Sequence, residues 1–480
     1  MTRQITSVVG GGTVAGGDAH VDVNPSDLGD VVLEYGGVDA DTAKAALESA
    51  AATFPIWSRT TPWERSMVLD KAGTEVLARA AELGDLLARE EGKTLPEARG
   101  EVVRAGQILK YFAGNVLAPH GHVLDSVRSG VEVSVTREPI GVVSVITPWN
   151  FPIAIPAWKI APALAYGNTV VFKPAELVPG SAWELVDILN RAGLPAGGLN
   201  LVLGRGSVVG PVLTTDPLVN GVTFTGSVGT GRGILDAHAP LGRKVQLELG
   251  GKNAVIVLED ADIDAAASAI AFGAWFHQGQ ICMTTGRILA QNKIVAALTE
   301  KLVAKANHLP VGDPLGQVAL GPVINKAQVQ RIDGIVKDSV AAGAKLEAGG
   351  TFDGPFYKPT VLTGVKPGMR AFDEEIFGPV AAITSIGSDD EAVQLANHNE
   401  YGLSAGVFST DVGRAIAVGN RLNTGLLHIN DQTVADEPHI PFGGSGASGN
   451  GTRIGGPANW DEFTQWQWMT IKDKPNPYPF

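Results

Sequence analysis

Apolar residues follow two different spacings along the chain. Between residues 40 and 118 they recur at helical spacing, as in Ala43, Ala46 and Leu47, and predict a run of helices. From residue 139 onward, short apolar runs alternate with helical stretches, and such runs are typical of strands buried on both faces. The predicted buried strands are 141–146, 169–173, 199–203, 221–225, 244–249 and 253–258. This alternation predicts βαβ units and a parallel sheet covered by helices, which places the chain in the α/β class.

A second α/β segment is expected from about residue 260 to 447. Its first helix, 262–277, leads directly to Cys282, the only cysteine of the chain. Further helices are predicted near 293–307, 324–342 and 389–397, with strands between them.

Two stretches outside these segments also have the alternation of strands. Residues 119–138 predict a strand pair, and 463–471 predict a strand that carries Trp466 and Trp468. Little sequence remains after 471 to cover that strand. An exposed strand with two tryptophans is a liability unless another subunit pairs with it, so we expect an oligomer.

Length and charge narrow the class of protein. A chain of 480 residues is too long for one core, so two or three domains are expected. The formal net charge of -13 argues against a nucleic-acid partner and against an anionic membrane surface. One cysteine allows no internal disulfide, and the nine scattered histidines form no cluster of metal-ligand spacing. With no apolar leader and no long apolar run, we expect a cytoplasmic protein without a membrane segment.

Cys282 has two interpretations. A lone cysteine is most often a small buried hydrophobe. Here, however, it follows a long apolar helix and lies between Gly279 and Gly286, a polar, glycine-flanked setting at the end of an element. A thiolate in such a position is a good nucleophile toward carbonyl carbon when its surroundings lower its pKa.

Two candidate ligand-binding features follow predicted strands. The stretch 224–232, FTGSVGTGR, places glycines between a strand and a helix, where backbone N–H groups can reach a pyrophosphate. Its order, GxxGxG, differs from the usual dinucleotide fingerprint, and a plain tight turn is the alternative. Glu176 follows another strand end, where a carboxylate can accept hydrogen bonds from ribose hydroxyls. Its alternative is an acid that interacts with a helix dipole.

Two polar residues lie in apolar strand contexts. Glu248 lies in an apolar strand that ends in Gly-Gly, and burial would raise its pKa toward the range of a general base. The alternative is a salt bridge with Lys252 or Arg243. Asn150 lies in a proline-flanked turn and could donate to an oxyanion, although asparagine is also an ordinary turn residue.

Taken together, the chain resembles the NAD(P)-dependent aldehyde dehydrogenase superfamily over nearly its full length. Seven segments match in family order and spacing: 148–152 (PWNFP), 173–176 (KPAE), 224–227 (FTGS), 248–252 (ELGGK), 279–282 (GQIC), 374–379 (EEIFGP) and 441–444 (PFGG). The resemblance implies that Cys282 is the nucleophile, that Glu248 is the general base, and that Asn150 forms the oxyanion hole with the Cys282 backbone N–H.

The resemblance further implies an NAD site. Its residues would be Ile146, Trp149, Lys173, Glu176, Gly226, Ser227, Glu375 and Phe377. Glu176 should repel a 2′-phosphate and favour NAD, while Lys173 could still tolerate NADP, so the preference is a matter of degree.

It also implies three parts in a homodimer or homotetramer. These are a Rossmann-like NAD-binding domain (1–118 and 139–250), an α/β catalytic domain (251–447) and a small strand-built oligomerisation domain (119–138 and 448–480).

Only the resemblance to particular dehydrogenases narrows the class of substrate. The resemblance to the benzaldehyde and vanillin dehydrogenases lies in segments 428–434, 436–439, 446–451 and 462–468. We therefore expect an aromatic aldehyde as the substrate. Its oxidation would pass through a Cys282 thioester, which water activated by Glu248 would hydrolyse. By family position, the substrate tunnel would be lined by Phe151, Ile155, Trp158, Phe276, Ile281, Met283 and Phe442, with core packing as the alternative for each. None of these is cationic, which argues against a dicarboxylic semialdehyde, and His439 or Asn430 could reach a ring hydroxyl.

Two other functions remain open at this point. One is an aldehyde dehydrogenase for aliphatic or semialdehyde substrates. The other is a dehydrogenase fold kept as a binding or structural protein, which predicts the loss of a catalytic residue. Cys282, Glu248 and Asn150 are all present, so this last hypothesis is disfavoured.

Overall fold

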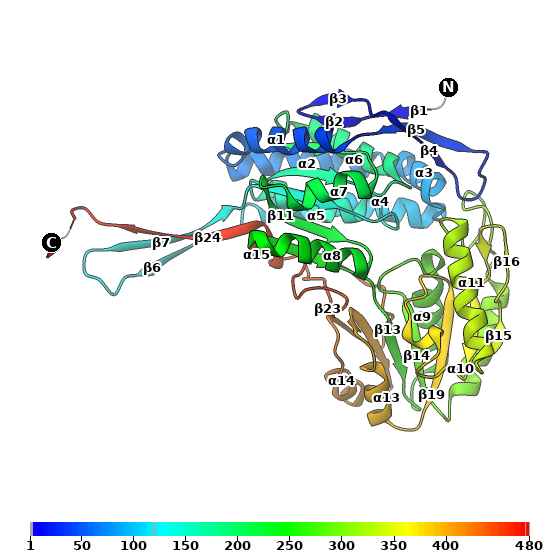
Figure 1. The fold of residues 1–480 in the computed structure, drawn as a ribbon. Helices are drawn as coiled ribbons and strands as arrows, with labels where there is room; N and C mark the ends of the chain where they lie inside the picture. The colour runs from blue at the N-terminus through cyan, green and yellow to red at the C-terminus, as the bar shows by residue number, and fades with distance from the viewer. Residues whose placement is uncertain (1–2, 119–120, 476, 480) are drawn as a thin grey trace.

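The computed structural model describes residues 3–118, 121–475 and 477–479. Two seven-stranded sheets, each flanked by helices, form the body of the molecule, and a long antiparallel arm projects from it (Figure 1). The predicted α/β class is confirmed. No helix within these described ranges is both long and apolar enough to cross a membrane.

The first sheet has the strand order β12-β11-β8-β9-β10-β2-β3. Its strands are β2 (Ser7–Val9), β3 (Gly12–Val14), β8 (Val142–Ile146), β9 (Thr169–Lys173), β10 (Leu199–Leu201), β11 (Val219–Thr225) and β12 (Lys244–Glu248). Strands β8 to β12 are mutually parallel, while β2 and β3 are antiparallel additions at one edge. The parallel order reverses between β8 and β11, and ligands of such sheets bind at the carboxyl ends beside this reversal.

In the part of the chain that the structure describes, eight helices pack on or near this sheet. They are α1 (Ala40–Trp57), α2 (Pro62–Ala78), α3 (Ala80–Glu91), α4 (Leu95–Asn115), α5 (Ala154–Ala165), α6 (Pro179–Ala192), α7 (Gly206–Thr215) and α8 (Val228–His238). Proline stands in the first turn of α2 and of α4, where a missing N–H costs nothing, and both helices begin with a capping box. Helix α4 packs between α2 and α5 and so lies against the element that follows Asn150.

The second sheet has the order β15-β18-β19-β14-β13-β21-β22. Its strands are β13 (Asn253–Val257), β14 (Thr285–Gln291), β15 (Lys345–Ala348), β18 (Thr360–Thr363), β19 (Val380–Ile386), β21 (Ser404–Phe408) and β22 (Leu426–Ile429). Its helices are α9 (Ile263–Trp275), α10 (Val295–His308), α11 (Lys326–Ala341), α12 (Arg370–Asp373), α13 (Asp389–Ala396) and α14 (Val412–Gly419). Separate apolar clusters cover its two faces.

Helix α9 is shorter than the pattern predicts. The expected helix 262–277 ends at Trp275, and a tight 3-10 turn, η2 (Phe276–Gly279), follows. His277, Gln278 and Gly279 have φ angles of 50°, 54° and 67°, in the left-handed region that L side chains rarely adopt. These three residues reverse the chain and turn the following cysteine loop toward the first sheet.

The projecting arm is a three-stranded antiparallel sheet of β6 (His122–Asp125), β7 (Glu132–Pro139) and β24 (Thr464–Ile471). Strand β24 pairs with β7 along its whole length, from Thr464 opposite Pro139 to Ile471 opposite Glu132. The predicted strands are therefore present, although residues 119 and 120 lie outside the described residues. Trp466 and Trp468 are 49% and 69% exposed, in agreement with the expectation of an uncovered strand.

The remaining elements are short. A three-stranded sheet of β1 (Arg3–Ile5), β5 (Val31–Gly37) and β4 (Asp18–Val23) borders the first unit. Two small pairs are β16 (Phe352–Asp353) with β17 (Phe356–Tyr357), and β20 (Tyr401–Gly402) with β23 (Ser445–Gly446). A 3-10 turn, η1 (Ala239–Leu241), follows α8, and α15 (Ala458–Phe463) packs against α5 and β12 before the arm begins.

Candidate active site

Cys282 lies in a loop that side chains from the second unit hold in place. The Asn253 amide, at the start of β13, donates to the backbone oxygens of Cys282 and Thr284, both at 2.8 Å. The Thr433 hydroxyl donates to the Met283 oxygen at 2.7 Å. Cys282 itself is half-buried, and burial together with the negative charges of Glu375, Glu248 and Asp436 raises the pKa of its thiol. A rigid loop thus presents a neutral thiol among carboxylates.

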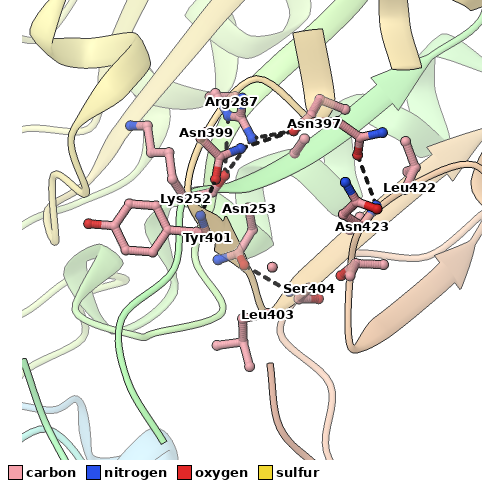
Figure 2. A pocket seen from close by; sticks show the side chains of 15 residues that line it. Lys252, Asn253, Arg287, Asn397, Asn399, Tyr401, Leu403, Ser404, Leu422 and Asn423 are labelled. Carbon is pink, nitrogen blue, oxygen red and sulfur yellow. Dashed lines mark hydrogen bonds between the residues drawn. The ribbon is translucent and has the colours of Figure 1, made fainter. Parts of the chain in front are cut away.

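A small polar pocket of about 20 Å³ lies behind this loop (Figure 2). Within it the Asn253 amide oxygen accepts from the Ser404 N–H at 3.0 Å, and Arg287 donates to the backbone oxygens of Lys252 and Ala396. Because its groups are largely bonded to one another, this pocket supports Asn253 and is not itself a candidate ligand site.

Asn150 lies in the turn after β8 and is buried. Its amide donates to the Gln280 oxygen at 2.8 Å, which joins the turn to the cysteine loop. Its backbone oxygen accepts from the buried Lys93 ammonium, which also pairs with Glu101. An amide nitrogen carries two donors, so one N–H of Asn150 is left for a bound oxygen.

Glu101 completes the support of this turn. One of its oxygens accepts from the backbone N–H groups of Ile153 and Ala154, at 3.0 and 3.1 Å, just before α5. Below the turn, His277 and Glu91 form a second, fully buried pair at 2.9 Å. Burial raises the pKa of Glu91 and lowers that of His277 to about 3, so burial favours the neutral form of each group.

Glu248 ends β12 and is 4% exposed. One carboxylate oxygen accepts from the Gln246 amide at 2.8 Å, and the other is buried without a hydrogen-bond partner among the described residues. Burial raises its pKa well above the usual range, and the charge of Lys159 opposes that shift. The alternative salt bridge with Lys252 or Arg243 is wrong: Arg243 donates to backbone oxygens of Pro217 and Val219, and Lys252 makes no ion pair there.

The predicted cofactor residues gather at the carboxyl ends of the first sheet. Ile146 and Lys173 end the neighbouring strands β8 and β9, and Trp149 follows β8. Gly226 follows β11, and Ser227 is the N-cap of α8, so the helix N-terminus opens toward this edge. The glycine-rich stretch is therefore a strand-to-helix turn at the reversal point of the sheet.

Lys173 and Glu176 form the other half of this edge. Lys173 is buried and lies 3.7 Å from the Glu176 carboxylate, which also accepts from the Gly206 N–H at 2.6 Å. Gly206 begins α7, so Glu176 interacts with the N-terminus of that helix and not with its own helix α6. The carboxylate remains 39% exposed, as a ribose ligand requires.

Glu375 and Phe377 come from the second unit to face this edge. Glu375 accepts from the Gly251 N–H at 3.0 Å, and burial raises its pKa to about 7. Phe377 has a φ of 55° and packs edge-on against Trp149 at 5.6 Å between ring centroids. A cleft of about 800 Å³ has Ser227 and Glu375 in its lining, which joins residues of the two units in one cavity.

Most predicted tunnel residues belong to, or pack against, the same large apolar core as Cys282, and their role as a tunnel stays a prediction. Trp158, Ile281, Met283 and Phe442 are buried in one apolar cluster, against which Phe151, Phe276 and Cys282 pack. Trp158 and Phe442 face each other at 5.6 Å between ring centroids. Ile155 is half-buried and is not part of this cluster, so its role stays a prediction.

The two residues expected to reach a ring hydroxyl each face another residue of the chain, and their role stays a prediction. The Asn430 side chain accepts from the Ser409 N–H at 2.9 Å and so fastens the end of β21. His439 is 58% exposed and faces Glu437 at 3.5 Å. No motif marks the charged residues Lys93, Glu101 and Arg104 in the sequence, and Asp436 is named only as part of the segment 436–439.

Comparison with known proteins shows the family of this chain. Residues 14–469 match the model of the aldehyde dehydrogenase family. A vanillin dehydrogenase from Amycolatopsis sp. is 44% identical over 97% of this chain and 96% of its own, and a benzaldehyde dehydrogenase [NAD(+)] from Pseudomonas putida is 42% identical over 97% and 95%. An alpha-ketoglutaric semialdehyde dehydrogenase from Bacillus subtilis is 39% identical over 94% of each chain.

A solved structure supports the same assignment. Betaine aldehyde dehydrogenase from Staphylococcus aureus, in complex with NAD+, superposes with a TM-score of 0.96 at 32% identity, over 99% of this chain and 96% of its own. This chain therefore belongs to the aldehyde dehydrogenase family.

Proposed function

We propose that this enzyme oxidises an aromatic aldehyde to its carboxylic acid with NAD. The observation that carries the proposal is the convergence of Cys282, Asn150 and Glu248 beside an aromatic and aliphatic cluster. The names of the vanillin and benzaldehyde dehydrogenases that it resembles support the substrate class.

Cys282 would attack the carbonyl carbon of the aldehyde. A carbon–sulfur bond forms, and the free N–H of Asn150 with the Cys282 backbone N–H would stabilise the developing alkoxide, a contribution of about 3 kcal/mol for one such donor. Because burial raises the pKa of the thiol, its proton must leave as sulfur attacks; the Glu248 carboxylate, whose charge affects the thiol, would accept that proton and release it to solvent before hydrolysis.

The carboxyl edge of the first sheet would hold NAD, which would supply the acceptor for the hydride of the adduct carbon. The residues at the carboxyl edge of the first sheet fit its parts: the α8 N-terminus with Ser227 suits a pyrophosphate, and Lys173 and the exposed Glu176 carboxylate suit the adenosine ribose. Glu375 and Phe377 would lie beside the nicotinamide ribose and ring. Glu176 disfavours a 2′-phosphate, which favours NAD over NADP.

Glu248 would then release the product. Its partnerless oxygen can accept a proton from water, and burial raises its pKa, which makes the carboxylate a stronger base. Water adds to the thioester carbon, the carbon–sulfur bond breaks, and Cys282 leaves as the acid is released.

We further propose that the arm formed by β6, β7 and β24 joins subunits in a homodimer or homotetramer, with the domain boundaries expected from the sequence. The exposed Trp468 and Val123, at 69% and 88%, support this role because such side chains are rarely left in water.

The test is NADH formation, comparing kcat/KM for benzaldehyde and hexanal. We expect a preference of about tenfold or more for benzaldehyde, because aromatic walls contact a flat ring best. Cys282→Ala is the matched control: it should abolish turnover while NAD still binds. Equal rates, or a preference for hexanal, would overturn the aromatic assignment, and dehydrogenase activity in the alanine variant would overturn the nucleophile.

A further inference from the structure

Arg104 and Asp436 bring opposite charges together near the candidate nucleophile. Arg104 lies on α4 and Asp436 in the segment between β22 and β23, and the Arg104 Nε is 4.0 Å from an Asp436 oxygen. Their side chains are 35% and 27% exposed. No mechanistic step described above uses either residue.

Both elements that carry the pair are fastened to the catalytic loops. One turn before Arg104, Glu101 binds the backbone N–H groups that follow the Asn150 turn. Three residues before Asp436, Thr433 is hydrogen-bonded to the cysteine loop, and Val434 packs in the apolar cluster with Cys282. The Asp436 charge is among those that affect the Cys282 thiol. The pair therefore lies beside the apolar cluster and within electrostatic reach of the sulfur.

The Arg104 and Asp436 side chains are too far apart to use their hydrogen-bond donors and acceptors on each other. A separation of 4.0 Å is too long for a hydrogen bond. Both side chains are partly exposed, at 35% and 27%, so each keeps polar groups open to a bound molecule. A half-buried carboxylate and a guanidinium that do not bond each other gain from a partner that supplies both a donor and an acceptor.

A phenol hydroxyl is such a partner. We propose that Arg104 and Asp436 recognise a hydroxyl on the ring of the aromatic aldehyde: Asp436 accepts from the hydroxyl, and Arg104 donates to its oxygen. This inference rests on the proposed aromatic aldehyde function. It makes the pair a specificity determinant for hydroxylated rings.

The same pair discriminates against two other kinds of aldehyde. An unsubstituted ring leaves the carboxylate and the guanidinium partly desolvated and unsatisfied, which costs binding energy. A semialdehyde with a terminal carboxylate presents acceptors only, and it meets the negative charge of Asp436 beside Arg104. Asp436 thus prevents Arg104 from acting as a carboxylate site.

The experiment measures the ratio of kcat/KM for para-hydroxybenzaldehyde to that for benzaldehyde. In Asp436→Ala this ratio should fall by about tenfold or more, since a site built to bond a hydroxyl discriminates strongly. Glu437→Gln is the control, because it removes a neighbouring exposed carboxylate, and its ratio should equal that of the wild type. Asp436→Ala should also raise kcat/KM for succinic semialdehyde, because Arg104 then lacks its counter-charge.

An unchanged ratio in Asp436→Ala overturns the inference. If that variant is inactive with both aldehydes, Arg104→Gln decides: a ratio lowered by about threefold or more supports recognition of the hydroxyl, and an unchanged ratio overturns it. The wild-type comparison of benzaldehyde with hexanal is separate, so failure of the proposed aromatic function is distinguishable from failure of the hydroxyl selector.

Discussion

Two buried carboxylates in the site, Glu101 and Glu248, differ in how fully they are bonded. Glu101 pairs with Lys93 and accepts from two backbone N–H groups. Glu248 accepts from one amide and keeps a buried oxygen without a hydrogen-bond partner among the described residues. Burial alone does not separate them, because they are 5% and 4% exposed.

This difference in bonding distinguishes a carboxylate that positions its neighbours from one that can take part in a reaction. A carboxylate whose acceptor sites are occupied stabilises the fold around it and has little capacity left for a proton or a water. A carboxylate that is buried and partly unsatisfied is costly to the fold, and that cost is typical of a group kept for a reaction. Replacing each carboxylate by a neutral amide should therefore impair different properties: turnover at Glu248 and stability at Glu101.

The largest effect on turnover is expected from Glu248→Gln. The amide keeps the shape but cannot accept a proton from water, so thioester hydrolysis should slow by about a hundredfold or more. Rapid mixing with NAD and aldehyde should show one fast turnover of NADH followed by a slow steady state. A steady rate equal to that of the wild type would contradict the assignment of Glu248 as the base. Thermal stability should be retained, since a buried unsatisfied charge is lost.

Glu101→Gln should show the reverse pattern. It leaves the Lys93 ammonium buried without a counter-charge, so the free energy of unfolding should fall by about 3–5 kcal/mol, with a smaller effect on turnover per folded molecule. Denaturant unfolding measures the loss. The double variant Lys93→Met with Glu101→Gln should recover part of it, because both charges are then gone.

A matched surface control sharpens this result. Asp85 and Arg99 form an exposed pair at 2.8 Å, and Asp85→Asn should change the stability by about 1 kcal/mol or less. If Glu101→Gln costs no more than this control, the buried pair is not what holds the Asn150 turn in place.

The contrast also explains what the sequence could predict. Glu248, Asn150 and Cys282 could be proposed from the sequence because each lies in a short segment that resembles the aldehyde dehydrogenase family, and such local segments can be read without the fold. The alternating strands of the arm could be predicted for the same reason. Lys93 with Glu101 could not, because their importance comes from the approach of α4 to the Asn150 turn, which no local pattern encodes.

Two further misses have similar physical causes. Arg104 and Asp436 are distant in sequence and meet only in the folded chain. The end of α9 was misplaced because His277 and Gln278 adopt positive φ angles without the glycine or asparagine that usually marks them. Their strained backbone is tolerated where His277 is fully buried against Glu91.

The smallest effect is expected at Gln246, which links Glu248 to its surroundings. The Gln246 oxygen accepts from Lys159 at 2.7 Å and from Thr223, so its amide nitrogen must point toward Glu248. That donation stabilises the carboxylate and lowers its pKa against the larger effect of burial.

Gln246→Met removes the donation at nearly constant volume, so the pKa of Glu248 should rise further. Because the carboxylate is the active form and is populated above its pKa, activity should be lost first at low pH and kept at high pH. The acid limb of the kcat–pH profile should therefore move to higher pH by about one unit or less, as expected for a single hydrogen bond. Thr223→Val is the control, since it leaves the bond from Gln246 to Glu248 in place. The assignment is contradicted if the acid limb moves to lower pH, or if it moves equally in Gln246→Met and Thr223→Val. Glu248 would then not govern the acid limb, and its unsatisfied oxygen would reflect packing alone.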